Sequence, residues 1–187
     1  MTKKFKTSDM VYSAVGAVII AIASQIMIPF SAVPFTLQTF GVALTLVALG
    51  GKRGTVSSLV YILMGAVGIP VFSGFKGGVG HLVSLTGGYI VGFLVMGIVY
   101  LIFENALKNK FNKLGYKILA LAIGNVFCYV IGTVWFYVVS MKNGSGYGFL
   151  GILTLCVFPY IVPDAVKIYV AAVTGKILRK AISKNEK

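Results

Sequence analysis

The chain is poor in charged residues and poorest in acidic ones. Its 187 residues include four Asp or Glu against 17 Lys or Arg, which gives a formal net charge of +13. One histidine, two cysteines without metal-ligand spacing and no Walker A sequence exclude zinc-protease motifs, Ser-His-Asp sets and ATP hydrolysis. The sequence therefore predicts a protein that is neither an enzyme nor a holder of a metal or other cofactor.

What the chain has in abundance is apolar sequence. Hydrophobic residues make up 58% and charged residues 11%, whereas soluble domains contain roughly 45–50% apolar residues. The length fits one membrane domain over residues 1–187, with a lipid bilayer as its surroundings. The positive charges are clustered between apolar runs and do not form a continuous face, so we expect no nucleic-acid partner.

The basic clusters predict how the chain crosses the membrane. Apolar runs lie near residues 10–29, 37–50, 54–72, 86–104, 117–140 and 158–178, the second and third being short against the ~20 residues of a span. If all six runs span and the N-terminus is cytoplasmic, every cluster faces the cytoplasm, as the positive-inside rule requires. The fold class predicted is an all-α integral protein of the plasma membrane with six transmembrane helices and both termini cytoplasmic. The clusters are Lys3, Lys4 and Lys6; Lys52 and Arg53; Lys108, Lys110, Lys113 and Lys117; and Lys176, Arg179, Lys180, Lys184 and Lys187.

The first apolar run resembles a secretory signal, but apolar sequence continues past Ala21-Ile22-Ala23, and we interpret it as an uncleaved helix. Small residues at four-residue intervals, Ser13, Ala17 and Ala21, allow another helix to approach closely. That neighbour is either internal or another subunit. Cys128 and Cys156 lie in apolar segments and are interpreted as packed thiols.

Asp164 and Lys167 form a charged pair inside an apolar segment. Residues three apart share one face of a helix, and each charge costs about 2.5–3.5 kcal/mol at the bilayer centre. Such residues mark functional sites by default, although a pair that only joins two helices is the alternative. If Pro163 opens the helix, Asp164 lies near its positive dipole end.

Asn125 and Tyr129 are four residues apart and can face one partner, either in a helix–helix hydrogen bond or in a shared pocket. Two predicted outward connections, residues 29–41 and 69–89, carry almost no charge but many glycines and aromatic residues. They are interpreted as lids over a cavity, with flexible turns as the alternative.

Several motifs occur in the order typical of one family. They are PFTLQTFG at 34–41, KRG at 52–54, MGAVGIPVF at 64–72, LTGGYIVGF at 85–93, GN at 124–125 and P-D-x-x-K at 163–167. Over roughly residues 10–180 the chain resembles the BioY family, the biotin-specific substrate-binding (S) components of energy-coupling factor (ECF) transporters. Ser84-Leu85-Thr86 replaces the family's usual Gly-Pro-Thr start of the second lid.

The resemblance implies a six-helix S-component bundle that captures biotin at the outer face, with both loops closing over the ligand. Transport is then energised by a separate transmembrane T component and two cytosolic ATPases. The family's docking stripe on the first helix maps onto Ala14, Ala17 and Ala21, although Gly16 leaves its register open.

For biotin as the transported ligand, the resemblance implies three groups of contacts. Asp164, Lys167 and Asn125 satisfy the ureido ring, while Phe35, Tyr89 and Tyr129 enclose the apolar parts. The carboxylate is bound by backbone N–H groups near Thr86, Gly87 and Gly88 or by the side chains of Thr36 and Gln38. The alternatives are an S component for another vitamin, a structural membrane subunit without a ligand, and a proton-coupled carrier; the last is disfavoured because the carboxylate is already paired with a lysine.

Overall fold

Long apolar helices make up most of the structure. The computed structural model describes residues 6–28, 34–142, 144 and 148–185. Each of the six apolar runs coincides with a helix, and shorter elements lie between them. The elements are α1 (Thr7–Gln25), β1 (Met27–Ile28), β2 (Phe35–Thr36), α2 (Gln38–Leu49), α3 (Gly51–Ala66), α4 (Val79–Leu82), α5 (Gly87–Leu107), the 3-10 helix η1 (Lys108–Asn112), α6 (Leu114–Lys142), α7 (Phe149–Cys156) and α8 (Phe158–Asn185).

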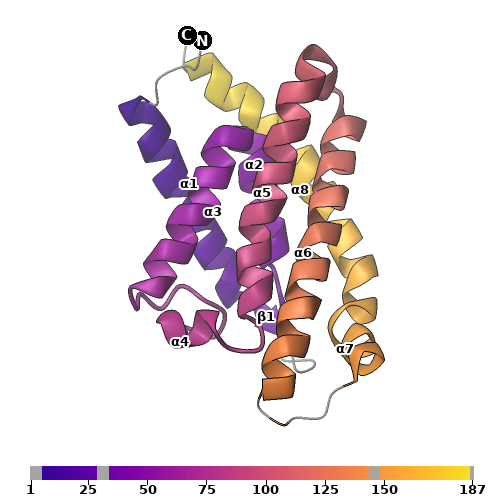
Figure 1. Ribbon diagram of the computed structural model, residues 1–187. Helices are drawn as coiled ribbons and strands as arrows, with labels where there is room; N and C mark the ends of the chain where they lie inside the picture. Colours follow the sequence, from indigo (N-terminus) through magenta and orange to yellow (C-terminus); the bar gives the residue numbers. More distant parts are fainter. Residues whose placement is uncertain (1–5, 29–33, 143, 145–147, 186–187) are drawn as a thin grey trace.

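The helices run side by side and give the molecule two distinct ends (Figure 1). The start of α1, the α2–α3 junction, η1 and the end of α8 lie together at one end, here called the basic end. Ion pairs between described residues join helices there, Arg53 to Asp9 at 2.6 Å and Arg179 to Glu104 at 3.0 Å. The described basic clusters therefore share one end, as the sequence predicts.

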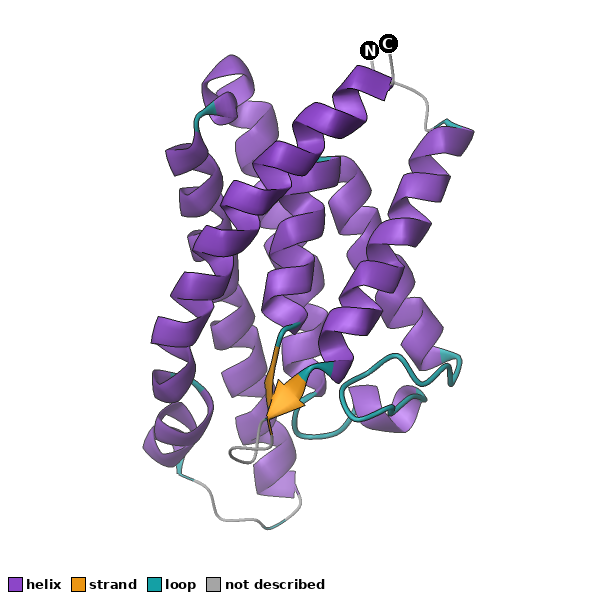
Figure 2. Cartoon of the chain, turned by 180° about the vertical axis from the view of Figure 1, so that it is seen from behind, coloured by secondary structure: helices purple, strands orange, loops and turns teal. Residues whose placement is uncertain are grey.

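The opposite end, here called the loop end, carries the strands, α4 and α7 (Figures 1 and 2). β1 and β2 form an antiparallel pair in which Met27 lies opposite Thr36 and Ile28 opposite Phe35. This small sheet departs from the all-α prediction. Residues 29–33 of the first predicted lid lie outside the described residues, as do Lys3, Lys4 and Lys187.

Helix α2 lies at the centre of the packing, because most of its side chains are buried. Two glycines let its neighbours approach closely. A Cβ added to Gly54 of α3 would lie 2.7 Å from Leu46 Cα, and one added to Gly175 of α8 would lie 2.8 Å from Val47 Cβ. Small residues at helix contacts are typical of membrane bundles.

The outer surface of the bundle is also apolar. Val126, Val130 and Val134 of α6, for example, each expose more than half of their area. Within the described residues, four segments are long and apolar enough to cross a membrane: Thr7–Gln25, Gly87–Asn112, Leu114–Lys142 and Phe149–Lys184. Helix α2 is apolar but has 12 residues, and α3 has 16. The structure is therefore that of a multi-pass helical membrane protein.

One local prediction is wrong. Helix α8 begins at Phe158, so Pro163 lies inside it and does not open it. Pro159 occupies the first turn, where a missing N–H is tolerated. Pro163 leaves the Pro159 carbonyl without its usual intrahelical donor. Asp164 thus lies beyond the first turn. Its carboxylate is bonded by the side chains of Tyr129 and Lys167 rather than placed at the helix N-terminus.

Candidate functional site

Asp164 and Lys167 are buried together on α8. Asp164 is 4% exposed and Lys167 7%, and Nζ of Lys167 lies 2.8 Å from Oδ1 of Asp164. The ammonium also donates a 2.7 Å hydrogen bond to the backbone oxygen of Thr36 in β2. Buried charges need pairing and further hydrogen bonds to offset their lost hydration, and both are present here.

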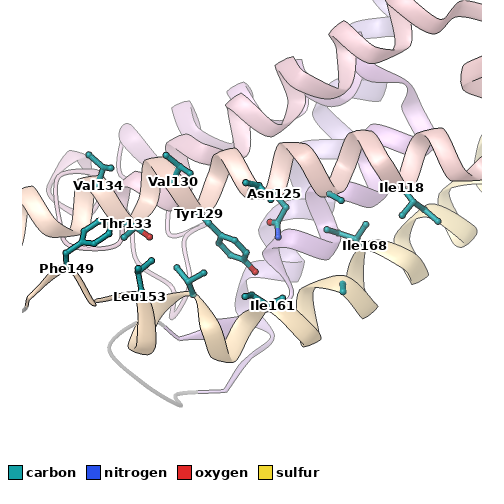
Figure 3. A pocket seen from close by; sticks show the side chains of 14 residues that line it. Ile118, Asn125, Tyr129, Val130, Thr133, Val134, Phe149, Leu153, Ile161 and Ile168 are labelled. Carbon is teal, nitrogen blue, oxygen red and sulfur yellow. The ribbon is translucent and has the colours of Figure 1, made fainter. Parts of the chain in front are cut away.

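The second oxygen of Asp164 is bound from α6. The hydroxyl of Tyr129 donates a 2.6 Å hydrogen bond to Oδ2, and Asn125 lies one turn earlier on the same side of α6 (Figure 3). Tyr129 therefore makes the predicted helix–helix bond, and both residues also line a pocket. Tyr129 thus combines the two arrangements that the sequence left open, whereas for Asn125 the structure shows the pocket position.

These residues surround a cavity of about 60 Å³, here called the polar chamber. Phe35 is not among the lining residues but lies next to one of them, since Nζ of Lys167 is 3.8 Å from the centre of the Phe35 ring. The Phe35 ring in turn stacks on Tyr160 at 6.2 Å. Among the residues predicted from the sequence, those that line the chamber are Thr36, Gln38, Tyr89, Asn125, Tyr129, Asp164 and Lys167.

Thr36 and Gln38 are fixed by a short chain of hydrogen bonds. The Thr36 hydroxyl donates to Oε1 of Gln38 at 3.0 Å, and Nε2 of Gln38 donates to the hydroxyl of Tyr61 at 2.7 Å. These bonds occupy the Thr36 hydroxyl and one of the two N–H groups of the Gln38 amide, so both side chains order β2 and the start of α2. The geometry does not favour the predicted role of the Thr36 hydroxyl as a carboxylate donor, whereas Gln38 keeps a second N–H.

Several lining residues escape the sequence analysis. Tyr160 lies four residues before Asp164, a spacing that places both on one helix face. Its position beside Asp164 could therefore have been predicted from the sequence. That of Cys156 could not, because the contact of α7 with the chamber depends on packing. Both cysteines are buried free thiols, as expected. The lining residues not predicted are Pro34, Thr39, Phe93, Cys128, Cys156 and Tyr160.

Thr86, Gly87 and Gly88 do not line the polar chamber. The N–H of Gly87 donates to the Ser84 carbonyl at 3.1 Å, and a Cβ added to Gly88 would lie 2.2 Å from Cβ of Trp135. The Gly87 N–H, one of the groups predicted to bind a ligand carboxylate, is therefore bonded within the protein. Gly88 permits close packing of α5 on α6, and Gly87 permits close approach to the backbone of Leu82 in α4.

A larger, apolar groove of about 540 Å³ runs between α6, α7 and α8. Figure 3 shows Val130 and Val134 from α6, Leu153 from α7 and Ile161 from α8 around it. Asn125 and Tyr129 line both this groove and the polar chamber. These two side chains thus form the wall between the charged pair and a surface suited to hydrocarbon.

The small residues of α1 are divided between two faces. Ala17 is fully buried and Ala21 packs partly buried against the core, whereas Ala14 is exposed. Ala17 is therefore an internal packing residue and not part of an exposed docking stripe, a correction to its assignment. The exposed face of α1 consists of Val11, Ala14, Val15, Val18 and Ile22.

No group of three potential metal ligands occurs among the described residues.

Comparison with known proteins gives consistent matches. The profile of the BioY family matches residues 1–184. The chain is 33% identical to a biotin transporter BioY of Thermotoga maritima, covering 92% of this chain and 96% of that protein. It is 33% identical to biotin transporter BioY2 of Lactococcus lactis, covering 93% and 91%. A crystal structure of the S-component for biotin from an ECF-type ABC transporter matches with a TM-score of 0.79 and 27% identity, covering 96% of this chain and 95% of the other.

Proposed function

Because the chain belongs to the BioY family, we propose that it is the biotin-binding S component of an ECF transporter. Its function is capture of biotin for uptake across the membrane, not catalysis. The observation that carries the proposal is the buried Asp164–Lys167 pair, which lines a polar chamber inside a bundle of apolar helices. A charged pair that lines a cavity fits a solute site better than a structural ion pair does.

The hydrogen-bonding capacity of the pair suits a ureido ring, which offers two N–H donors and one carbonyl acceptor. A carboxylate has about four lone-pair sites, and the bonds to Tyr129 and Lys167 leave part of this capacity for two N–H groups. An ammonium has three donors. Two of them bind Asp164 and the Thr36 carbonyl, so one remains for the ureido oxygen, with the Asn125 amide beside it.

Aromatic residues supply the apolar contacts for the fused rings. Tyr89, Phe93, Tyr129 and Tyr160 line the polar chamber, and Phe35 lies against Lys167. At about 60 Å³ the chamber is smaller than the roughly 300–1,000 Å³ of typical ligand pockets. Binding therefore involves movement of the segments at the loop end, in agreement with their interpretation as lids.

The arrangement in the membrane follows from the charge distribution. In this arrangement six helices, the four long apolar segments and the shorter α2 and α3, span the bilayer as one domain of residues 1–187. The basic end and both termini face the cytoplasm, which places the polar chamber nearer the outer face. A separate T component and two cytosolic ATPases energise transport, and the exposed face of α1 around Ala14 contacts the T component.

Equilibrium binding to the purified chain tests the proposal. Labelled biotin should bind without ATP, with a dissociation constant of micromolar or lower, about −8 kcal/mol or better. Other vitamins serve as competitors. Displacement by a different vitamin at lower concentration would favour an S component of another specificity. Absence of both heat and retained label at saturating biotin would favour a structural membrane subunit.

A further inference from the structure

A second cavity adjoins the polar chamber at the loop end. This cavity, here called the loop chamber, has a volume of about 120 Å³. It shares Pro34, Gln38 and Tyr89 with the polar chamber, so the two form neighbouring compartments. The residues that line only the loop chamber are Ser73, Lys76, His81, Thr86 and Ile90.

The two chambers differ in charge. In the polar chamber the charges of Asp164 and Lys167 cancel. Lys76 brings a positive charge to the loop chamber, which no acidic side chain of the described residues lines. The three described acids, Asp9, Glu104 and Asp164, are each in an ion pair with another basic residue. The loop chamber is therefore an uncompensated cationic compartment, and such a compartment attracts anions.

The backbone that carries Lys76 is ordered by its own hydrogen bonds. Phe72 and Lys76 exchange backbone bonds of 2.9 and 3.2 Å across a tight turn, in which Gly74 has a φ of +73° that suits glycine. The Phe75 N–H donates to Oε1 of Gln25 at 2.9 Å and thereby ties the turn to α1. The backbone from which the exposed Lys76 side chain extends is thus held in place.

Neutral donors stand beside this cation. The His81 ring stacks on Phe72 with 5.4 Å between ring centres, which fixes its plane. Burial and then the neighbouring charge of Lys76 lower the pKa of His81, so the ring is neutral at pH 7 and offers one N–H. The hydroxyl of Thr86 lies 3.5 Å from that of Ser84, a long contact that leaves it available to a closer partner.

We propose that the loop chamber binds the carboxylate of the solute whose uncharged head occupies the polar chamber, with Lys76 as the ion partner and His81 and Thr86 as donors. This inference rests on the proposed biotin function and adds a determinant of specificity to it. The neutral chamber accepts the neutral ureido head, and the cationic chamber accepts the anionic tail. The protein therefore selects the free acid against derivatives in which the carboxylate is blocked or replaced.

Lys76 and His81 add a charged and a neutral donor to those expected from the sequence. Of the expected donors, the Thr36 hydroxyl, the Gly87 N–H and one N–H of the Gln38 amide are bonded within the protein. A carboxylate is best matched by a charged donor, because charge-assisted hydrogen bonds are roughly twice as strong as neutral ones.

Binding of two ligands to the unmodified chain and two variants tests the assignment. The ligands are biotin and biotinol, in which CH₂OH replaces the carboxylate. The unmodified chain, Lys76→Met and Lys142→Met are compared by calorimetry. Lys142 is the control because it lies in the last turn of α6, outside both chambers. Lys76→Met should weaken biotin about tenfold or more and leave biotinol unchanged, whereas Lys142→Met should change neither.

Equal weakening of both ligands in Lys76→Met would overturn the assignment, because it would show that Lys76 only positions the turn. Unchanged affinities for both ligands would overturn it as well. Lys76→Glu supplies a second comparison: it should abolish biotin binding and retain biotinol binding. If the unmodified chain binds biotin and biotinol equally, the carboxylate site is refuted while the biotin function stands; if it binds neither, the proposed function itself fails.

Discussion

The hydroxyl of Tyr129 and the carboxylate of Asp164 connect α6 to α8 through a 2.6 Å hydrogen bond at the back of the polar chamber. Tyr129 also lines the apolar groove on the other side. One side chain thus bonds the buried carboxylate on one side and lines the groove on the other; Figure 3 shows Tyr129 in the wall of this groove.

Removing this hydroxyl should weaken ligand binding while leaving the fold intact. This bond exists without ligand, and a hydrogen bond to a charged group contributes about 1.5–3 kcal/mol to stability. Tyr129→Phe should therefore fold with a lower melting temperature, and its dissociation constant for biotin should rise because the Asp164 carboxylate is no longer oriented. Calorimetry on the purified variant measures the change. Tyr169→Phe is the matched control, since Tyr169 is 57% exposed on α8 and its loss should have no effect. Equal affinities for Tyr129→Phe and the unmodified chain would contradict the role.

The charged pair should behave as one recognition unit. Asp164→Asn leaves Lys167 buried without its counter-ion, which typically costs about 3–5 kcal/mol of stability. The double variant Asp164→Leu, Lys167→Met removes both charges, so it should fold with a melting temperature near that of the unmodified chain but show no shift on adding biotin. Thermal melts with and without ligand decide between the two roles. A biotin-induced shift that survives in the double variant would identify the pair as purely structural.

Docking to the energising subunits should depend on the exposed face of α1. Ala14→Trp adds bulk at an exposed position, and we expect normal biotin binding with reduced co-purification of the T component and ATPases. Val166→Trp on the exposed surface of α8 is the control. Loss of biotin binding in Ala14→Trp with intact assembly would exclude this face as the docking surface.

Biotin affinity should increase as the pH falls from 7.5 to 5.5. The pKa of His81 is lowered from its ordinary value of 6.5, first by burial and then by Lys76. A carboxylate bound beside the ring favours the imidazolium and raises this pKa in the complex, so binding takes up a proton in the interval between the two values. The ligand carboxylate stays ionised across most of this range, as ordinary carboxyl groups titrate near 4.3.

Titration calorimetry at several pH values should therefore give a several-fold tighter dissociation constant at pH 5.5 than at pH 7.5. In His81→Gln the pH dependence should disappear. Weaker binding at low pH, or an identical slope in His81→Gln, would show that another group controls the titration.

The local features of this protein could be predicted from its sequence. Six apolar runs coincide with helices, because apolar length and composition determine where a helix can lie in a membrane. The contact of Asp164 with Lys167 and the shared direction of Asn125 and Tyr129 follow from helical spacing alone. These features depend on neighbours within one turn of the chain.

The features that could not be predicted from the sequence depend on which distant segments contact each other. The burial of Ala17 follows from the packing of α1 against other helices, and a small residue suits an internal contact as well as an external one. The bond from Lys167 to the Thr36 carbonyl joins residues 131 positions apart. The meeting of Lys76 with His81 likewise required the turn at the loop end, and Pro163 was placed wrongly because the preceding proline already begins the helix.

The bond between Lys167 and the Thr36 carbonyl has a kinetic consequence. Displacing β2 from α8 breaks this 2.7 Å bond and separates the ammonium from the Phe35 ring. The same cation binds the ureido oxygen in the proposed complex, so a bound ligand strengthens the surroundings that keep β2 in place. Dissociation of the ligand then requires the Lys167 ammonium to lose its contacts with the ligand, the Thr36 carbonyl and the Phe35 ring together. We therefore expect variants that break this bond to change the dissociation rate of the ligand more than its association rate.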